Sequence, residues 1–134
     1  MRYDVVAGGY GIGMADDMLT QALDATDEIE ITVTGRTSGR EHSTPVWFVR
    51  ERDDMFLVPV DASRSNWFKN VRENPTIRID ARGASLTAHA TPITDQAEVD
   101  RIVDKFRAKY GADSVERYYP NANVAVDVPL DTGR

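Results

Sequence analysis

The chain contains no cysteine and only two histidines among its 134 residues. Without thiols it can form no disulfide, use no cysteine nucleophile and offer no cysteine-ligated metal site. The two histidines, His42 and His89, lie far apart in the sequence and show no metal-binding spacing, so we expect no metal site. No Gly-x-Ser-x-Gly motif is present, which leaves serine hydrolysis without local support.

Long apolar runs and an excess of positive charge are missing as well. No apolar run approaches the ~18 residues of a membrane-spanning helix, and no basic segment followed by an apolar one marks a signal peptide. We therefore expect no transmembrane segment and a cytoplasmic location. The net charge of −6 argues against non-specific nucleic-acid binding, because neutralising backbone phosphates requires a basic surface.

The first 14 residues, M-R-Y-D-V-V-A-G-G-Y-G-I-G-M, are rich in glycine. They resemble the first strand and turn of a dinucleotide-binding fold, but Met14 stands where the third small residue belongs. The rest of the chain predicts successive strands rather than alternating strands and helices. We therefore interpret residues 1–14 as an N-terminal arm, 15–130 as one domain and 131–134 as a C-terminal tail.

Hydrophobic periodicity in the remaining chain predicts a mainly β protein with flanking helices. The expected strands cover residues 29–34, 45–50, 55–60, 76–80, 85–93 and 122–128, and the expected helices cover 15–25 and 65–73. A third helix should begin after the capping box of Asp95 and Glu98 and end near Tyr110, before Gly111. Residues 114–119 fit neither pattern clearly.

The stretch Thr34–Phe48, T-G-R-T-S-G-R-E-H-S-T-P-V-W-F, combines glycines, hydroxyl side chains and two arginines ahead of an apolar run. Glycine allows the backbone to approach a ligand closely. Hydroxyls, backbone N–H groups and arginine forks donate to anionic oxygens. The composition therefore fits a loop that holds a phosphorylated cofactor. It fits equally a polar hairpin loop with solvated arginines.

A second motif, S-N-W-F-K-N-V-R-E-N-P, follows at residues 65–75 and leads into T-I-R-I-D. Together the two motifs resemble the signature of the split-barrel flavin and deazaflavin oxidoreductases. That family includes coenzyme F420-dependent reductases and FMN-binding relatives of pyridoxamine-phosphate oxidase. The resemblance covers roughly residues 28–93. It implies a six-stranded antiparallel split β-barrel of the FMN-binding type, with flanking helices and a homodimeric assembly.

The same resemblance implies where a cofactor would bind. In the family, the glycine-arginine turn holds the phosphate, the start of the second strand lines the ring edge, and the end of the third strand packs against the ring. The following helix adds contacts. Carried over by match, the cofactor-binding residues are Arg36, Ser38, Gly39, Arg40, His42, Ser43, Thr44, Pro45, Val46, Val58, Pro59, Val60, Arg64, Asn66, Trp67 and Lys69. No catalytic side chain is identified.

The resemblance implies an oxidoreductase that transfers a hydride between coenzyme F420 and a small organic substrate. In such an enzyme the cofactor carries the redox chemistry, and the fold supplies binding and orientation. Alternatives are an FMN-dependent relative of pyridoxamine-phosphate oxidase and a non-catalytic carrier of F420 or a tetrapyrrole. The aromatic residues Trp47, Trp67, Phe68, Tyr118 and Tyr119 either shape a substrate pocket or pack in the core.

Overall fold

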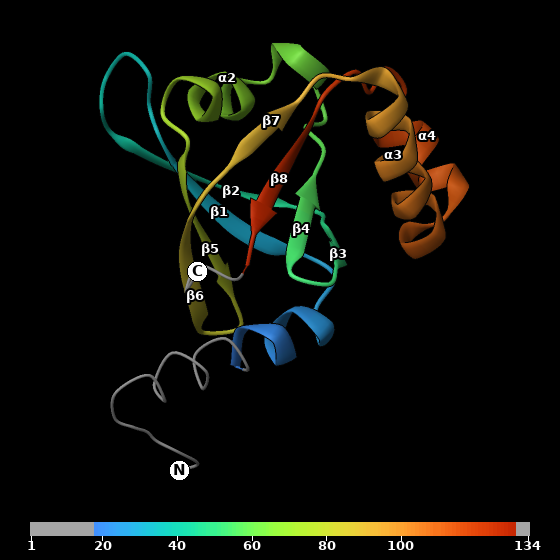
Figure 1. Ribbon diagram of the computed structural model, residues 1–134, viewed down its shortest axis with the longest axis horizontal. Coiled ribbons are helices and arrows are strands. Elements are labelled where there is room, and N and C mark those ends of the chain that lie inside the picture. The colour runs from blue at the N-terminus through green and yellow to red at the C-terminus, as the bar shows by residue number, and fades with distance from the viewer. Residues whose placement is uncertain (1–17, 131–134) are drawn as a thin grey trace.

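The computed structural model describes residues 18–130, which contain two four-stranded antiparallel sheets (Figure 1). The first sheet has the order β2-β1-β5-β6, with β1 at Ile29–Thr34, β2 at Glu41–Val46, β5 at Thr76–Ala81 and β6 at Ala84–His89. The second has the order β3-β4-β8-β7, with β3 at Val49–Glu51, β4 at Asp54–Leu57, β7 at Thr91–Ile93 and β8 at Ala125–Pro129. The expected arm, its dinucleotide-like turn and the expected tail lie outside the described residues.

The prediction of six strands in one barrel is not confirmed in that form, because two of the six runs are each divided. The run at 45–50 breaks at Trp47 and Phe48, between β2 and β3, and the run at 85–93 breaks at Ala90, between β6 and β7. At both breaks the chain passes from the first sheet to the second. Apolar residues on both faces indicate burial, but they do not indicate where a strand bends from one sheet into another.

Strand β2 also begins earlier than predicted, at Glu41. Its exposed polar side chains give no apolar alternation, yet its backbone pairs with β1 from Thr34↔Glu41 to Ile29↔Val46. Strand β4 ends at Leu57, before the predicted end at Val60. Pro59 lies just beyond it, and proline has no N–H to donate to a ladder.

Two hydrophobic clusters organise the core. The first lies between the sheets and includes Ile31, Met55, Leu57, Ile77, Ile79, Val126 and Val128; residues of α2 (Asn66–Glu73) and of the helical residues 18–24 pack into it. The second lies between the second sheet and the helices α3 (Gln96–Tyr110) and α4 (Ala112–Tyr118). In Figure 1 these two helices lie side by side, away from α2. A short 3-10 helix, η1, covers Ala62–Arg64.

The predicted helix boundaries are confirmed where the capping chemistry was explicit. The Asp95 carboxylate accepts a hydrogen bond from the Glu98 N–H at 3.0 Å, and Gly111 ends α3 with a φ of 96°. The Ser65 hydroxyl caps α2 by accepting from the Phe68 N–H at 3.4 Å. Residues 114–119, which were ambiguous in the sequence, belong largely to α4.

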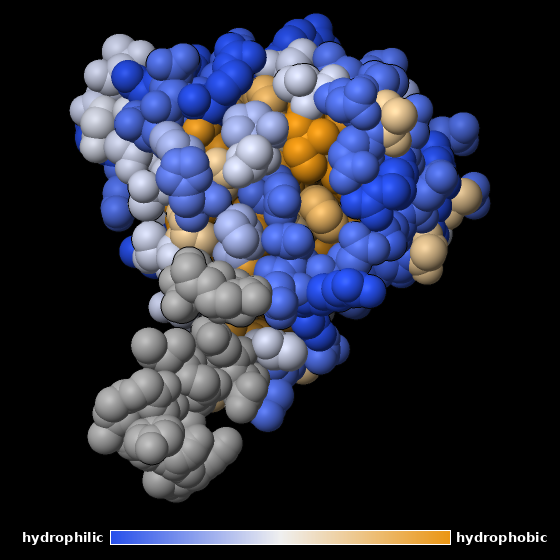
Figure 2. Space-filling model, in the orientation of Figure 1, coloured by the Kyte–Doolittle hydropathy of each residue, from blue (hydrophilic) through white to orange (hydrophobic). Residues whose placement is uncertain are grey.

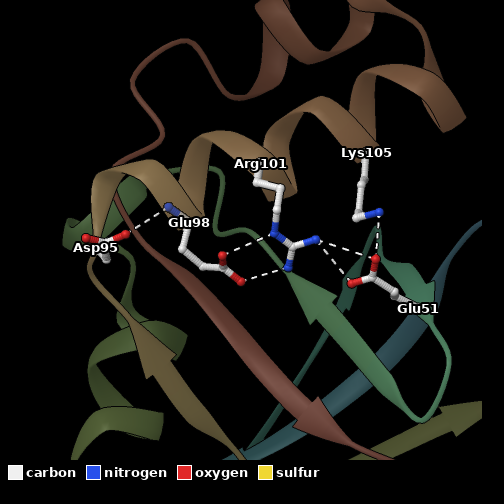
Figure 3. Close-up of polar contacts among 5 residues, drawn as sticks. All are labelled: Glu51, Asp95, Glu98, Arg101 and Lys105. Atoms are coloured by element: carbon white, nitrogen blue, oxygen red, sulfur yellow. Dashed lines mark hydrogen bonds and ion pairs between the residues drawn. The ribbon is translucent and has the colours of Figure 1, made fainter.

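Charged side chains connect α3 to the edge of the second sheet (Figure 3). Arg101 lies 2.7 Å from the Glu98 carboxylate and 3.2 Å from that of Glu51, which also pairs with Lys105 at 2.9 Å. These hydrogen bonds lower the pKa of Glu51. Each pair is substantially exposed, so each should stabilise the fold by at most about 1 kcal/mol. The network therefore orients α3, while the apolar cluster beneath it supplies most of the attachment.

The Asp127 carboxylate on β8 leads to a prediction of how the stability of the fold depends on pH. Asp127 alternates along β8 with the buried Val126 and Val128, so it points to the face that carries α3. Burial, followed by the neighbouring Asp54 carboxylate, raises the pKa of Asp127 from 3.8 to about 6. A raised pKa gives stability that is present below pH 3.8 and is lost as the pH rises through about 6.

Asp127→Asn should therefore stabilise the protein relative to wild type at pH 7 but not at pH 4, by on the order of 1 kcal/mol for this half-buried group. Denaturant unfolding of both proteins at several pH values measures the difference. Asp54→Asn is a matched variant, because removing the neighbouring charge should bring the pKa of Asp127 down and flatten the same profile. Parallel pH profiles for wild type and Asp127→Asn would contradict the prediction.

The surface facing the viewer in Figure 2 is mostly hydrophilic, with hydrophobic residues visible in small separate areas. No helix within residues 18–130 has the length and apolar character needed to cross a membrane.

Candidate functional site

The hairpin between β1 and β2 is a tight loop built by its own backbone. The Gly35 N–H donates to the Arg40 carbonyl at 2.7 Å, and the Gly39 N–H donates to the Gly35 carbonyl at 3.0 Å. The Ser38 hydroxyl accepts from the Arg40 N–H at 3.1 Å. Gly39 has a φ of 75°, which favours glycine over a residue with a side chain. The loop is therefore internally bonded before any ligand arrives.

A buried asparagine on α2 attaches this hairpin to the body of the protein. The Asn70 side-chain oxygen accepts from the backbone N–H of Arg36 at 3.1 Å and from its guanidinium at 2.7 Å. Asn70 is only 6% exposed, so these bonds satisfy a polar group that would otherwise be costly to bury. Arg36 forms no ion pair with any carboxylate in the described part of the chain. Its position is fixed while its charge remains available.

Gly35 allows two side chains to lie close to the hairpin backbone. A Cβ at this position would lie 2.8 Å from the Ser38 hydroxyl oxygen and 2.9 Å from His42 Nε2. Both atoms therefore occupy the space that any larger residue would need. Ser38 and His42 are thus held against the base of the loop.

These residues form one side of a polar cleft of about 510 Å³. The other side comes from the segment before α2 and from α2 itself. The lining residues are Gly35, Arg36, Thr37, Ser38, His42, Thr44, Asp61, Asn66, Trp67 and Asn70. Hydroxyl, amide and guanidinium groups dominate, and Asp61 is the one carboxylate in this lining. A phosphate-sized anion would find its hydrogen-bond donors on the hairpin side of the cleft, whereas Asp61 belongs to the opposite side.

An aromatic cleft of about 430 Å³ adjoins the polar cleft. Thr44 and Trp67 line both, so the two clefts are neighbours, and we refer to them together as the groove. The aromatic cleft is lined by Glu28, Thr44, Pro45, Val46, Trp47, Val58, Val60, Trp67, Tyr118 and Tyr119. Its volume is typical of a small-molecule site. The groove offers anion donors at one end and flat apolar surfaces at the other.

Trp47 forms a wall of the aromatic cleft and is held by contacts with three tyrosine rings. Its ring stacks on Tyr110 with centroids 4.2 Å apart and an interplanar angle of 8°, and Tyr118 and Tyr119 meet it edge-on. The Tyr110 hydroxyl accepts from the Phe48 N–H at 3.1 Å and lies 2.7 Å from the Asp27 carbonyl oxygen. Burial raises the pKa of Tyr110 to about 12, so this hydroxyl stays protonated at neutral pH. One face of Trp47 is thereby fixed.

The structure brings ten of the predicted site residues to this groove. They are Arg36, Ser38, His42 and Asn66 in the polar cleft, Thr44 and Trp67 in both clefts, and Pro45, Val46, Val58 and Val60 in the aromatic cleft. Six lie outside either lining: Gly39, Arg40, Ser43, Pro59, Arg64 and Lys69. The Ser43 hydroxyl lies 2.8 Å from that of Thr32 on β1, which directs it along the sheet.

Several lining residues were not predicted as site residues. Asn70 is the most important, and the sequence carried a signal for it: a polar residue among Trp67, Phe68 and Val71 on the apolar side of α2. Trp47, Tyr118 and Tyr119 were weighed as pocket or core residues, and the structure places all three in the lining. Glu28 gave no signal, because it stands in an ordinary polar position before β1.

Within residues 18–130, no group of three or more histidine, aspartate or glutamate side chains is placed to hold a metal ion.

A family model described as "Uncharacterized protein conserved in bacteria (DUF2255)" matches residues 19–126. No curated protein matches the sequence.

Solved structures with a similar fold include an F420-H2 dependent reductase, at a TM-score of 0.60 and 19% identity, covering 76% of this chain and 93% of that one. A protein from Listeria innocua described as a pyridoxamine 5'-phosphate oxidase matches at a TM-score of 0.58 and 15% identity, covering 84% and 90%. The heme storage protein HutZ from Vibrio cholerae matches at 0.66 and 11%, covering 87% and 90%. At these identities the likeness establishes the split-barrel type of fold.

Proposed function

The chain belongs to the DUF2255 family, and from the groove that its fold builds we propose that it binds a phosphorylated flavin-type cofactor. We favour coenzyme F420 over FMN. The proposed activity is hydride transfer between this cofactor and a small organic molecule.

The observation that carries the proposal is that the polar and aromatic clefts lie next to each other and share Thr44 and Trp67 in their linings. A flavin or deazaflavin has a phosphate at one end of its side chain and a flat tricyclic ring at the other. The polar cleft supplies Arg36 and the Ser38 hydroxyl for the phosphate. The aromatic cleft supplies Val46, Val58 and the fixed ring of Trp47 for the flat system.

The residues present fit such a cofactor in their chemistry as well as in their order. Arg36 is positioned by Asn70 and lacks a carboxylate partner among the described residues, so a bound phosphate would complete its interactions. When bound, the cofactor would supply the hydride chemistry. The chain would bind the phosphate, orient the ring by contacts with Val46 and Val58, and exclude water from it with Trp47 and Trp67.

Two other functions remain close to this one. FMN shares the ring and the phosphate, so an FMN-dependent enzyme would use the same groove. A carrier without turnover, for F420 or a tetrapyrrole, would also use flat apolar walls. The solved structures of similar fold include the F420-H2 dependent reductase, the protein described as a pyridoxamine 5'-phosphate oxidase and the heme storage protein.

The test is to add coenzyme F420, FMN and hemin separately to the purified protein and measure each dissociation constant. Reduced F420 is then mixed with a panel of organic acceptors under anaerobic conditions. We expect saturable F420 binding and oxidation of the reduced cofactor that depends on both protein and acceptor. Tighter FMN binding together with oxygen-dependent turnover would favour the FMN enzyme, and binding without turnover would favour a carrier.

Salt dependence separates F420 from FMN because F420 carries an additional anionic glutamate tail. Lys69 and Arg72 on α2, with Arg64 before it, are basic residues close in sequence to Asn66, Trp67 and Asn70, which line the polar cleft. Their attraction for the tail should weaken once the screening length falls to about 10 Å near 0.1 M salt. We expect F420 affinity to fall more steeply with salt than FMN affinity, and Lys69→Met to reduce the F420 slope only.

The matched control is Arg52→Met, which removes one positive charge at the turn between β3 and β4, away from α2 (Figure 1). This variant should leave both slopes unchanged. Equal slopes for the two cofactors in wild type would contradict a role for these basic residues in holding the tail.

Two structural features are part of the same proposal. The crossings from β2 to β3 and from β6 to β7 join the two sheets, and we infer that they close them into a six-stranded split barrel of bent strands. Val60 and Tyr118, which are 57% and 43% exposed at the aromatic cleft, favour a homodimer that covers this rim. Light scattering coupled to size-exclusion chromatography measures the oligomeric state.

A further inference from the structure

A third cleft, of about 440 Å³, lies between the helical residues 18–24, β3 and the last turns of α3. Phe48 lines it, whereas the preceding residue Trp47 lines the aromatic cleft. None of the sixteen predicted site residues belongs to it. Its lining has five charged residues, four apolar residues and one threonine, and consists of Leu23, Asp24, Thr26, Asp27, Phe48, Val49, Arg50, Lys105, Ala108 and Lys109.

The three cations of this cleft differ in their partners. Arg50 pairs with Asp24 at 2.9 Å, and Lys105 pairs with Glu51 at 2.9 Å. Lys109 forms no ion pair within the described part of the chain. Its ammonium group donates to the Phe48 carbonyl at 2.9 Å and lies 3.5 Å from the centre of the Phe48 ring. Lys109 is therefore held by neutral groups alone.

This environment leaves the Lys109 charge poorly compensated. Burial lowers its pKa, and the more distant Asp27 and Asp24 carboxylates only partly oppose the effect. A partly dehydrated ammonium gains most from an anion placed directly against it. Of the three cations in the lining, Lys109 is the one without a carboxylate at ion-pair distance among the described residues, so an anion placed against it would complete the pairing.

We propose that the third cleft binds a small organic carboxylate, a site independent of the cofactor groove. The carboxylate would bind the Lys109 ammonium, and an apolar body would pack against Leu23, Phe48 and Ala108. A monoanion fits better than a phosphate dianion because Asp24 and Asp27 line the same cleft and repel additional negative charge. The volume lies within the range of small-molecule sites, about 300–1,000 Å³.

Trp47 provides a built-in reporter for this site. Lys109 and Tyr110 both approach the Phe48 carbonyl, at 2.9 Å in each case, and Tyr110 stacks on Trp47. A ligand that draws the Lys109 ammonium away from this carbonyl should alter the surroundings of the Trp47 indole. The chain has two tryptophans, so Trp67→Phe leaves Trp47 as the single indole.

The experiment titrates cyclohexanecarboxylate into the Trp67→Phe protein and follows tryptophan emission. We expect saturable binding with a Kd of about 1 mM or tighter. Introducing Lys109→Met into the Trp67→Phe protein should weaken carboxylate binding at least about tenfold, because a charge-assisted hydrogen bond is lost. Lys105→Met is the matched control, since it removes a cation from the same cleft that already has a carboxylate partner. It should change the Kd less than about twofold.

Neutral cyclohexanecarboxamide and inorganic phosphate complete the test, and both should bind more weakly than the carboxylate. Equal binding of the carboxamide would overturn the role of charge, and tighter binding of phosphate would overturn the choice of a carboxylate. An equal loss of carboxylate affinity in Lys109→Met and Lys105→Met, or the absence of saturable carboxylate binding, would overturn the proposed site. If Lys109→Met does not fold, two other measurements replace it. Amide NMR shifts at Ala108 and Lys109 should change when the carboxylate is added to the protein without substitutions, and Lys109→Arg should retain binding.

Discussion

Replacing Arg36 by methionine is expected to weaken coenzyme F420 binding by at least about tenfold, because charge-assisted hydrogen bonds contribute about 1.5–3 kcal/mol each. Arg36 is the guanidinium that lines the polar cleft, and its side chain is already positioned by Asn70 at 2.7 Å. Little side-chain freedom would be lost on binding, so most of the interaction should appear as affinity. Quenching of cofactor fluorescence measures the dissociation constant.

Arg40 provides the matched control within the same hairpin. The sequence pattern implicated both arginines, but Arg40 does not line the cleft. Arg40→Met should therefore change the affinity less than about threefold, as for a distant exposed charge. The melting temperature of Arg40→Met should stay close to wild type because its side chain is exposed, and that of Arg36→Met should fall only slightly because the Arg36 backbone N–H still donates to the buried Asn70 oxygen. An unchanged affinity in Arg36→Met would remove the polar cleft from the cofactor site.

Phe106→Ala is expected to lower the free energy of unfolding by about 3–5 kcal/mol, the usual cost of emptying an aromatic site in a core. Phe106 is fully buried between α3 and the second sheet. Its ring meets Tyr119 edge-on at 5.5 Å and lies 5.8 Å from the Tyr110 ring, and both tyrosines contact Trp47. The same substitution should therefore loosen the aromatic cleft and weaken ring binding.

Phe106→Leu distinguishes the loss of buried volume from the loss of the ring shape. It keeps most of the buried volume and should cost less than about 1.5 kcal/mol. Denaturant unfolding gives the free energies, and Trp47 emission reports the state of the cleft wall. A loss of less than 1 kcal/mol in Phe106→Ala, well under the usual range, would mean that α3 is not firmly packed on the sheet.

The sequence predicted the elements whose chemistry is local. The Asp95 cap and the Gly111 terminator of α3 each depend on residues a few positions apart, and both are found in the structure. The apolar alternation of β1 also gave its bounds correctly at Ile29–Thr34. In such cases the interacting groups are neighbours in the chain, so spacing alone is informative.

Long-range arrangements were harder to predict. The polar strand β2 is held by backbone pairing with β1, which leaves no side-chain pattern. The bends at Trp47 and Ala90 depend on which sheet each half joins. In the groove, the contact between Arg36 and Asn70 joins residues 34 positions apart. The hairpin motif indicated the arginine, but only the fold shows which of the two arginines faces the cleft.

The position of β8 has consequences during synthesis of the chain. β8 pairs with both β4 and β7, and its Val126 and Val128 belong to the core between the sheets. The strands of the first sheet all lie within residues 29–89 and can pair early. Until residue 129 has left the ribosome, β4 has one unpaired edge and β7, the outer strand of its sheet, has no strand partner. The nascent protein therefore passes through a half-built state with exposed strand edges, which is the stage at which aggregation competes with folding and chaperones act.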